Sequence, residues 1–521
     1  MKPAVPSCGL LLLDGMILSA IDSRVLQPVV ASATPSRTAS ARAGRIWLMA
    51  RFMTCCTRFG CSHSTWHRRA VLGAALGAPV ALAAAAVSPP AAAQGIAPTL
   101  VTIRDAETET LLRTFANPLF RASGVDPASV RTILIRDDAL NAFVSTGNRL
   151  FVNTGIIAKA DSALELIGVL AHEAGHIRGG HLARLPEMMR EAMIKSVAAM
   201  LIGVAAGVAG RSGEAGMGAM LGGQQLAQRG LMSFTRSMEN AADQSALYAL
   251  EQLGWSARGL TALFRRMQDQ DALIDDLQDP YLRTHPLTRD RIEAVTAHLA
   301  RSQYTNTPLP TGFEANFQMV RAKLRGFLEP STVTLRRIRE NDSAPAARYA
   351  RGIALYRLGR TDEALRLIDG LLAEQPSNPW LHELKGQVLF EGGRGAAAIP
   401  PYREAARLAP DWAPIRAALA RAMIETNDSS QLRLAIGHLQ SALARERDDS
   451  QSWRSLGIAW GRLGEMGQAD LALAEEALVL GDIPRARTLA RRAEKQLPQG
   501  PSRQRAVDVG NAVRKENREG F

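Results

Sequence analysis

The sequence predicts a mainly α-helical protein in two parts: an α+β domain with a small sheet, followed by an all-α array of repeats. Three observations support this fold class. A His-Glu-Ala-Gly-His stretch at residues 172–176 follows a segment whose apolar residues recur at helical spacing. Units of 34 residues recur after about residue 341. Of the 521 residues, 46% are hydrophobic but only 5% are aromatic, and the abundance of Ala, Leu and Arg favours helices.

Residues 1–93 are predicted to be an upstream extension and a cleavable signal peptide. Arg68 and Arg69 precede an apolar, Ala-rich run that ends at Val87. Three alanines at 91–93 then form a small-residue cleavage site. The apolar run is short for a membrane anchor. Twin arginines favour export by the Tat route, and a Sec signal is the alternative.

We therefore expect an exported protein that begins near Gln94 and resides in the periplasm. The upstream stretch is longer than an ordinary signal peptide, so Met49 or Met53 is the expected start of translation. All cysteines precede the expected cleavage site, at Cys8, Cys55, Cys56 and Cys61. The mature chain would then hold no disulfide.

The charge distribution argues against a nucleic-acid partner. The net charge is +12, and residues 1–93 hold nine Lys or Arg and two Asp, which gives that segment +7. The remaining +5 is spread over the other 428 residues, without a basic stripe interleaved with aromatic residues.

Residues 94–304 are predicted to form the α+β domain. Arg104 to Arg121 has the pattern of a helix. Thr132–Ile135 and Leu150–Asn153 are short strand candidates, with a turn at Gly147 and Asn148 ahead of the second. An extended peptide could pair with the free edge of such a strand.

The His172–His176 stretch predicts a catalytic zinc site. His172 and His176 are four residues apart, so both imidazoles lie on one helix face and can bind one Zn²⁺ ion. Glu173 is then placed to act as general base toward a water molecule. Residues 161–170 lead into the motif as a helix that Asp161 or Ser162 could cap.

A catalytic zinc ion needs a third protein ligand and one open position. Glu239 and Asp243 are again four residues apart on a helical segment. Glu239 could bind the metal, and Asp243 could accept a hydrogen bond from a ligand histidine and fix its tautomer.

At this point the chain resembles the HtpX/BepA-type zinc metallopeptidases, and is most similar to the periplasmic BepA-like branch with C-terminal tetratricopeptide repeats. The resemblance covers about residue 100 to the C-terminus. Beyond the motif it rests on Asn141–Phe143, Phe151–Gly155, His181, Phe234–Ser237 and Thr284–Leu287. Ala241 is a departure, because relatives often carry a second glutamate there.

The resemblance implies a zincin-like peptidase that acts on misfolded or stalled outer-membrane proteins, with the assembly machinery as partner of the repeats. It also draws attention to His285, because relatives carry a histidine in the same short motif. His285 could hold the enzyme latent as a fourth ligand, assist as an oxyanion donor, or be a solvent residue in a proline turn. His181 is expected to be structural or to support a ligand histidine.

Residues 196–210 form an apolar run, and a Gly- and Met-rich stretch follows at 211–223. The run is too short to span a bilayer comfortably. It is interpreted either as a helical hairpin packed on the domain, or as a mobile lid or peripheral membrane contact over the cleft.

Residues 305–340 are predicted to be a linker with a bridging helix at 316–325, and residues 341–521 a tetratricopeptide domain. Gly352 and Gly386 are one 34-residue period apart, as are Pro376 and Pro410. Two further units have Ala420 and Gly457 at the glycine position, and a degenerate closing unit is expected at about 471–497. Such arrays offer a concave groove to protein partners.

The predicted function is zinc-dependent endopeptidase activity. The main alternative is a tetratricopeptide chaperone or scaffold with a vestigial metal site, against which the presence of Glu173 argues, since a vestigial site needs no base. An integral-membrane protease would require several apolar runs of about twenty residues, which the predicted mature chain lacks.

Overall fold

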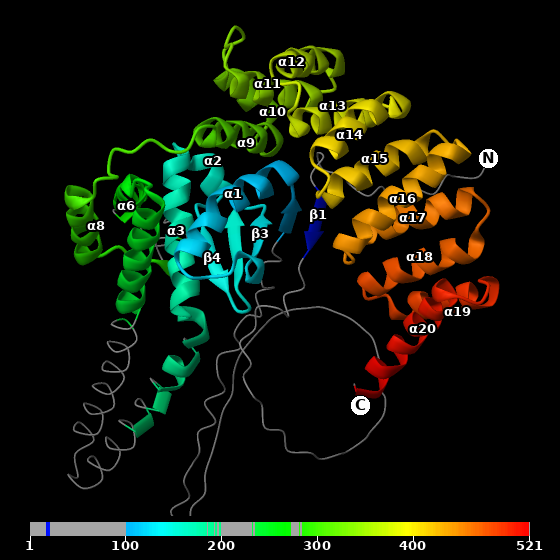
Figure 1. Ribbon diagram of the computed structural model, residues 1–521, viewed down its shortest axis with the longest axis horizontal. Helices are drawn as coiled ribbons and strands as arrows, with labels where there is room; N and C mark the ends of the chain where they lie inside the picture. Colours follow the sequence, from blue (N-terminus) through cyan, green and yellow to red (C-terminus); the bar gives the residue numbers. More distant parts are fainter. Residues whose placement is uncertain are drawn as a thin grey trace, which may run out of the picture. The chain divides into compact units, whose positions relative to one another are not determined.

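The structure is a computed structural model, and its elements are labelled in Figure 1. It describes residues 17–20, 101–184, 186–191, 193–194, 197–198, 232, 235–271, 281 and 284–519. The predicted signal peptide, the cysteines and the Gly- and Met-rich stretch at 211–223 lie outside the described residues, as does most of the apolar run at 196–210.

A five-stranded mixed sheet forms one layer of the first domain. Its strands are β1 (Ile17–Ala20), β2 (Val101–Arg104), β3 (Arg131–Ile135), β4 (Ala142–Ser145) and β5 (Arg149–Asn153). Their order across the sheet is β1-β2-β3-β5-β4. β3 and β5 run parallel, with Ile133 opposite Phe151, and the other neighbouring pairs are antiparallel.

The sheet contains both predicted strands, β3 and β5, and three that were not predicted, β1, β2 and β4. The predicted turn joins β4 to β5, and Gly147 and Asn148 both have positive φ there. The outer strand β1 lies within the segment assigned to the upstream extension, and it pairs with β2. At the opposite side, β4 is the outer strand.

Two long helices pack on this sheet and define the core. α1 (Ala106–Ala122) begins where the Asp105 side chain accepts a hydrogen bond from the Thr108 amide. α3 (Ala163–Gly179) is capped in the same way by Ser162 and ends at Gly180, which has left-handed φ and ψ. Both helices contribute fully buried aliphatic side chains to the main core cluster.

Further helices complete the first domain and lead to the repeats (Figure 1). Residues 235–253 are helical and lie against α3. The remaining elements are α2 (Thr154–Lys159), α6 (Arg258–Asp271), α8 (Arg289–Arg301), α9 (Phe313–Leu328) and α10 (Ser331–Arg337). α9 contains the predicted bridging helix, and it contacts α1, α2 and α3 as well as α11.

The predicted repeat array is present as five helix pairs. They are α11 (Pro345–Arg357) with α12 (Thr361–Glu374), α13 (Pro379–Glu391) with α14 (Gly395–Leu408), α15 (Ala413–Glu425) with α16 (Ser429–Arg445), α17 (Ser450–Arg462) with α18 (Met466–Val479), and α19 (Ile483–Gln496) with α20 (Pro501–Glu519). The closing unit therefore begins at Ile483, later than expected.

A small residue at the glycine position lets the two helices of a repeat approach. At Gly386, a Cβ would lie 2.7 Å from the ring of Tyr402 on α14. Any larger residue would push the two helices apart, because interiors are close-packed.

A buried polar set, here called the junction cluster, links the two parts of the chain. Lys323 on α9 lies 2.6 Å from an Asp105 oxygen and 3.3 Å from a Glu107 oxygen. Tyr349 of α11 donates a hydrogen bond to Glu107, and Glu383 of α13 lies 3.9 Å from the Lys323 ammonium. The first repeat is therefore bonded to α1 directly through Tyr349, and Lys323 of α9 lies between the carboxylates of both parts.

Candidate metal centre

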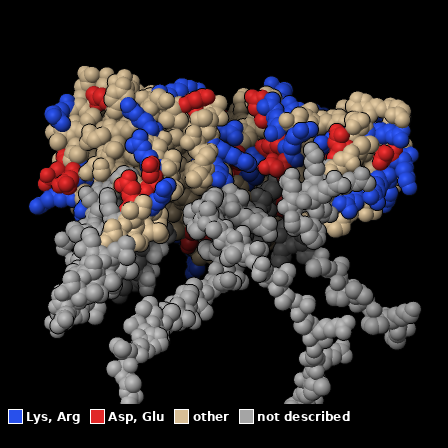
Figure 2. Space-filling model, turned by 90° about the horizontal axis from the view of Figure 1, so that it is seen from below, with Lys and Arg blue, Asp and Glu red and all other residues tan. Residues whose placement is uncertain are grey.

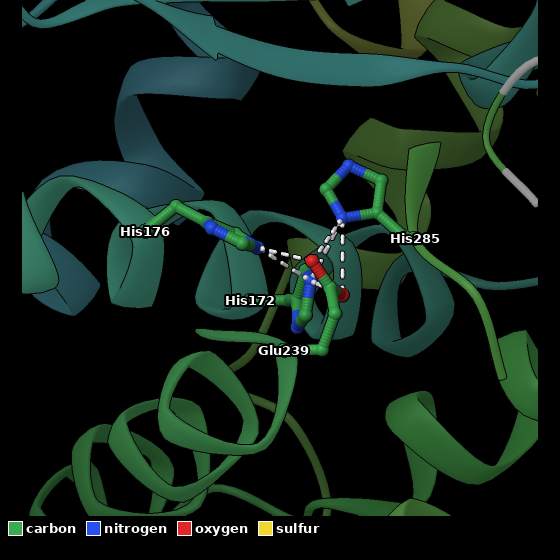
Figure 3. Close-up of side chains that lie close together, drawn as sticks. All are labelled: His172, His176, Glu239 and His285. Atoms are coloured by element: carbon green, nitrogen blue, oxygen red, sulfur yellow. Dashed lines mark hydrogen bonds and ion pairs between the residues drawn. The ribbon is translucent and has the colours of Figure 1, made fainter. Parts of the chain in front are cut away.

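Four buried side chains point their ligand atoms at one another (Figure 3). They are His172 and His176 from α3, Glu239 from the 235–253 helix and His285 from the segment before α8. The four ligand atoms all lie within 4.8 Å of one another. The structure thus brings together the three expected ligands and the histidine suggested by the resemblance.

The spacing of these atoms fits one metal ion. The two Nε2 atoms of His172 and His176 are 3.0 Å apart, and Glu239 oxygens lie 3.2 Å and 3.4 Å from them. His285 Nδ1 is 3.2 Å from Glu239 and 3.3 Å from His172 Nε2. Ligands at the usual zinc bond length of about 2.0–2.1 Å in a tetrahedron would be roughly 3.3 Å apart.

The approach of two helices sets this geometry. Gly175 of α3 faces the backbone of the 235–253 helix, where its Cβ would lie 2.4 Å from the Ala242 carbonyl oxygen. The helices can pack at this distance only because Gly175 has no side chain. As a result, the histidine pair on one helix and Glu239 on the other reach the same point.

Asp243 and Arg291 fix the orientation of His172. Asp243 Oδ1 lies 2.8 Å from His172 Nδ1, which leaves Nε2 for the metal. The guanidinium of Arg291 donates two hydrogen bonds to Asp243, at 2.6 Å and 3.0 Å, and lies 3.1 Å from Glu239. It also donates to the backbone oxygens of His285 and Pro286, so it ties the His285 segment to the ligand helix.

Arg291 was not identified from the sequence. It stands in the first turn of α8 among Arg289 and Asp290, where the local pattern resembles a solvated helix start. The available signal was its place six residues after His285, but only the tertiary structure shows that its side chain is 1% exposed.

Glu173 makes no hydrogen bond in the described part of the chain, and its Oε1 lies 3.6 Å from His285 Nε2. Both of its oxygens are buried. Burial raises the pKa of Glu173 to about 7, although His176 and His172 act in the opposite direction. A carboxylate with a pKa near neutrality suits a general base.

Tyr281 is a second residue that the sequence did not reveal. Its ring packs on His285 with centroids 4.5 Å apart, and its buried hydroxyl lacks a hydrogen-bond partner among the described residues. Burial raises the pKa of Tyr281, and the charge of Glu173 raises it further, which places the hydroxyl near the Glu173 carboxylate.

The remaining electrostatics follow the hydrogen bonds. Burial disfavours the charged form of His172, but bonds to Asp243 and Glu239 outweigh it and raise the pKa of His172 to about 9. The pKa of Glu239 is held far below its usual range despite burial, because three histidines bond to it. His181 Nδ1 lies 3.0 Å from His176 Nδ1, so it contacts the ring nitrogen that faces away from the metal position.

Comparisons with known protein families agree with this geometry. Residues 105–299 match the sequence model of peptidase family M48. Residues 335–379 and 349–411 match tetratricopeptide repeats. The chain therefore carries a metallopeptidase domain of family M48, followed by tetratricopeptide repeats.

Several curated proteins are similar over most of the chain. A beta-barrel assembly-enhancing protease of Yersinia pestis is 26% identical over 412 residues, which cover 77% of this chain and 83% of the relative. The protein of the same name in Escherichia coli (strain K12) is 25% identical over 428 residues, covering 77% and 82%.

The mitochondrial metalloendopeptidase OMA1 of Schizosaccharomyces pombe is 26% identical over 185 residues, or 36% of this chain and 51% of the relative. Among solved structures, a crystal structure of MamA is 20% identical and covers 32% of this chain and 95% of its own, with a TM-score of 0.25.

Proposed function

We propose that this chain is an exported zinc-dependent endopeptidase that hydrolyses peptide bonds of misfolded or stalled envelope proteins. The observation that carries the proposal is the pairing of four converging ligand atoms with a buried carboxylate, Glu173, that has no hydrogen bond in the described part of the chain. The names of the relatives, which are proteases that enhance β-barrel assembly, support substrates among outer-membrane proteins.

The roles of the residues follow from their positions. His172, His176 and Glu239 would hold the ion, and the mix of imidazole and carboxylate ligands is typical of catalytic zinc sites. When bound, zinc polarises the scissile carbonyl and lowers the pKa of water. Glu173 accepts the proton of the attacking water and passes it to the leaving amine.

Strand β4 offers a place for the substrate backbone. It pairs with β5 on one side, and no other described strand pairs with it. β4 also contacts α3, the helix that carries the ligand histidines. An extended peptide that adds to the outer side of β4 would lie beside the metal centre.

The position of His285 supports a resting state in which the enzyme is latent. Its Nδ1 takes the place of a fourth protein ligand, and four protein ligands are typical of structural zinc sites rather than catalytic ones. Movement of His285 would open the position that catalysis requires. In a displaced orientation its N–H could donate to the oxyanion instead.

The envelope location and the contacts of the protein are part of the same proposal. No helix among the described residues is long and apolar enough to span a bilayer. Four exposed apolar side chains follow α3 on one helical face: Met189, Met193, Ile194 and Val197. This exposed face supports peripheral membrane contact, and the repeats are the proposed contact with the outer-membrane assembly machinery.

The decisive experiment compares Glu173→Gln with the parent protein on casein, with metal content measured in parallel. The variant should retain zinc and lose at least about a hundredfold in cleavage rate, because the ligands remain while the base is gone. Glu293→Gln, an exposed change on α8, is the matched control and should cleave normally. Full cleavage by a zinc-loaded Glu173→Gln variant would refute the mechanism. A zinc-loaded parent without activity would favour the scaffold alternative.

A further inference from the structure

The inner face of the repeat array can be identified from its first two repeats. Tyr349 and Glu383 are the fifth residues of α11 and α13. Both point at the peptidase domain, Tyr349 toward Glu107 and Glu383 toward Lys323. Residues one helical turn later, at the ninth position, share that face.

Four of the six corresponding positions in the last three repeats carry arginines, and the fifth residue of α15 is the buried Ala417. Arg454 and Arg487 are the fifth residues of α17 and α19. Arg421 and Arg491 are the ninth residues of α15 and α19. The ninth residue of α17 is Ile458, whose side chain is 43% exposed. The inner face therefore changes from aromatic and acidic to basic, with one exposed apolar side chain among the arginines.

Arg454 and Arg421 are only partly neutralised by the chain itself. Arg454 and Arg485 share one buried carboxylate, that of Glu476. Arg421 has a buried Nη1 without a hydrogen-bond partner among the described residues. Glu425 and Glu494 lie one turn beyond Arg421 and Arg491. No acidic residue stands at the fifth or ninth position of α15, α17 or α19, so basic side chains predominate at these positions.

The first two repeats cannot offer a comparable surface, because their fifth residues are already engaged by α1 and α9. Basic side chains are visible over the repeats at the right of Figure 2. Arginine guanidinium groups pair with carboxylates in a planar, two-bonded geometry, and concave repeat surfaces suit extended chains.

We propose that the inner face of the last three repeats binds an extended acidic segment of a partner protein. Carboxylates of the segment pair with Arg421, Arg454 and Arg491, and an apolar side chain between them packs on Ile458. This site is independent of the metal centre, so its occupancy needs neither zinc nor Glu173.

The test uses the full chain and three labelled peptides of ten residues with the same central leucine, flanked by Glu and Asp, by Gln, or by Lys. Fluorescence anisotropy should detect binding of the acidic peptide alone, weakening as salt is raised. Arg421→Gln with Arg454→Gln should weaken that binding by about tenfold or more, since charge-assisted bonds are lost. Glu476 keeps Arg485 as a partner in this variant.

Arg403→Gln with Arg433→Gln is the control, because both residues are exposed on the outer helices α14 and α16. It should bind the acidic peptide as the parent does and should digest casein at the parent rate. Equal binding of the Gln peptide, or equal weakening in the control, would overturn the proposal. The proposal would also be overturned if an oligonucleotide of the same net charge displaced the acidic peptide. The surface would then bind anions in general and not acidic protein segments in particular.

Discussion

The metal centre and the junction cluster are both buried sets of carboxylates and cations, yet they are balanced differently. At the junction, the Lys323 ammonium lies close to Asp105 and Glu107, and both have hydrogen-bond partners besides. At the metal centre, Arg291 pairs with Asp243, while Glu173 is left without a hydrogen bond among the described residues. The junction cluster holds two parts of the chain together through Lys323, whereas Glu173 lies beside the metal ligands with a pKa of about 7 and is placed for chemistry.

The largest expected effect comes from a substitution that changes the metal centre and leaves the junction cluster intact. Glu239→Ala should reduce bound zinc and bring casein cleavage to background, because it removes one of the four converging ligand side chains. The junction cluster should be unaffected, so the repeats should unfold at the parent temperature in the metal-free forms of both proteins. Normal zinc content in the variant would place the third ligand elsewhere.

Lys323→Met should have the next largest effect, on stability alone. It leaves three carboxylates near one another without their cation, and breaking a buried pair in this way costs about 3–5 kcal/mol. Thermal unfolding followed by circular dichroism measures the loss. Lys385→Met removes a partly exposed pair with Asp369 and should cost at most about 1 kcal/mol. An equal loss of stability in the two variants would show that the buried junction cluster contributes no more to stability than a partly exposed ion pair.

His285→Ala tests how the metal centre is held. If His285 closes the site as a fourth ligand, its removal raises the basal rate of cleavage. If it donates to the oxyanion, the rate falls by about a hundredfold or more. Initial rates on one unfolded substrate decide the sign, and an unchanged rate would assign His285 to neither role.

The smallest effect is a pH dependence at the junction. Burial raises the pKa of Glu383 from 4.5 to about 7, and Lys323 only partly offsets this. Because the folded pKa lies above the unfolded one, the stabilising contribution is complete below about pH 4.5 and is lost as pH rises through about 7. Asp105, whose pKa is lowered, acts in the opposite sense and below this window, since its contribution is lost as pH falls.

Glu383→Gln should therefore be less sensitive than the parent between pH 4.5 and 7, by roughly 1–3 kcal/mol. Thermal midpoints at pH 5 and pH 8 provide the comparison. Glu374→Gln, an exposed residue paired with Arg348, should keep the parental difference. If Glu383→Gln also kept it, the sensitivity would come from another group.

Local patterns were sufficient for much of the fold and the centre. The i, i+4 spacing predicted that His172 would lie with His176 and Glu239 with Asp243, because residues four apart share one helix face, and the structure brings these four residues together. The 34-residue period revealed the repeats for a similar reason. Strands β2 and β4 were missed, since four residues give little periodicity.

Arg291, Tyr281 and Lys323 could not be predicted in the same way. Each acts through partners on other elements, such as Arg291 with Asp243, 48 residues away. A single sequence records which residue is present but not which distant residue it meets. His285 came from a family resemblance and not from its spacing.

The close contact at Gly175 has a consequence for reading related sequences. Within the stretch 172–176, His172 and His176 are the candidate metal ligands. A different residue of the same stretch, Gly175, sets the distance between the two helices. A homologue with alanine at this position would keep every ligand and the base, and would still display an intact motif. Its Cβ would meet the Ala242 carbonyl at 2.4 Å, so the two halves of the centre would separate. Such a chain would keep the motif in any sequence search, although its two helices could not pack at the distance found here.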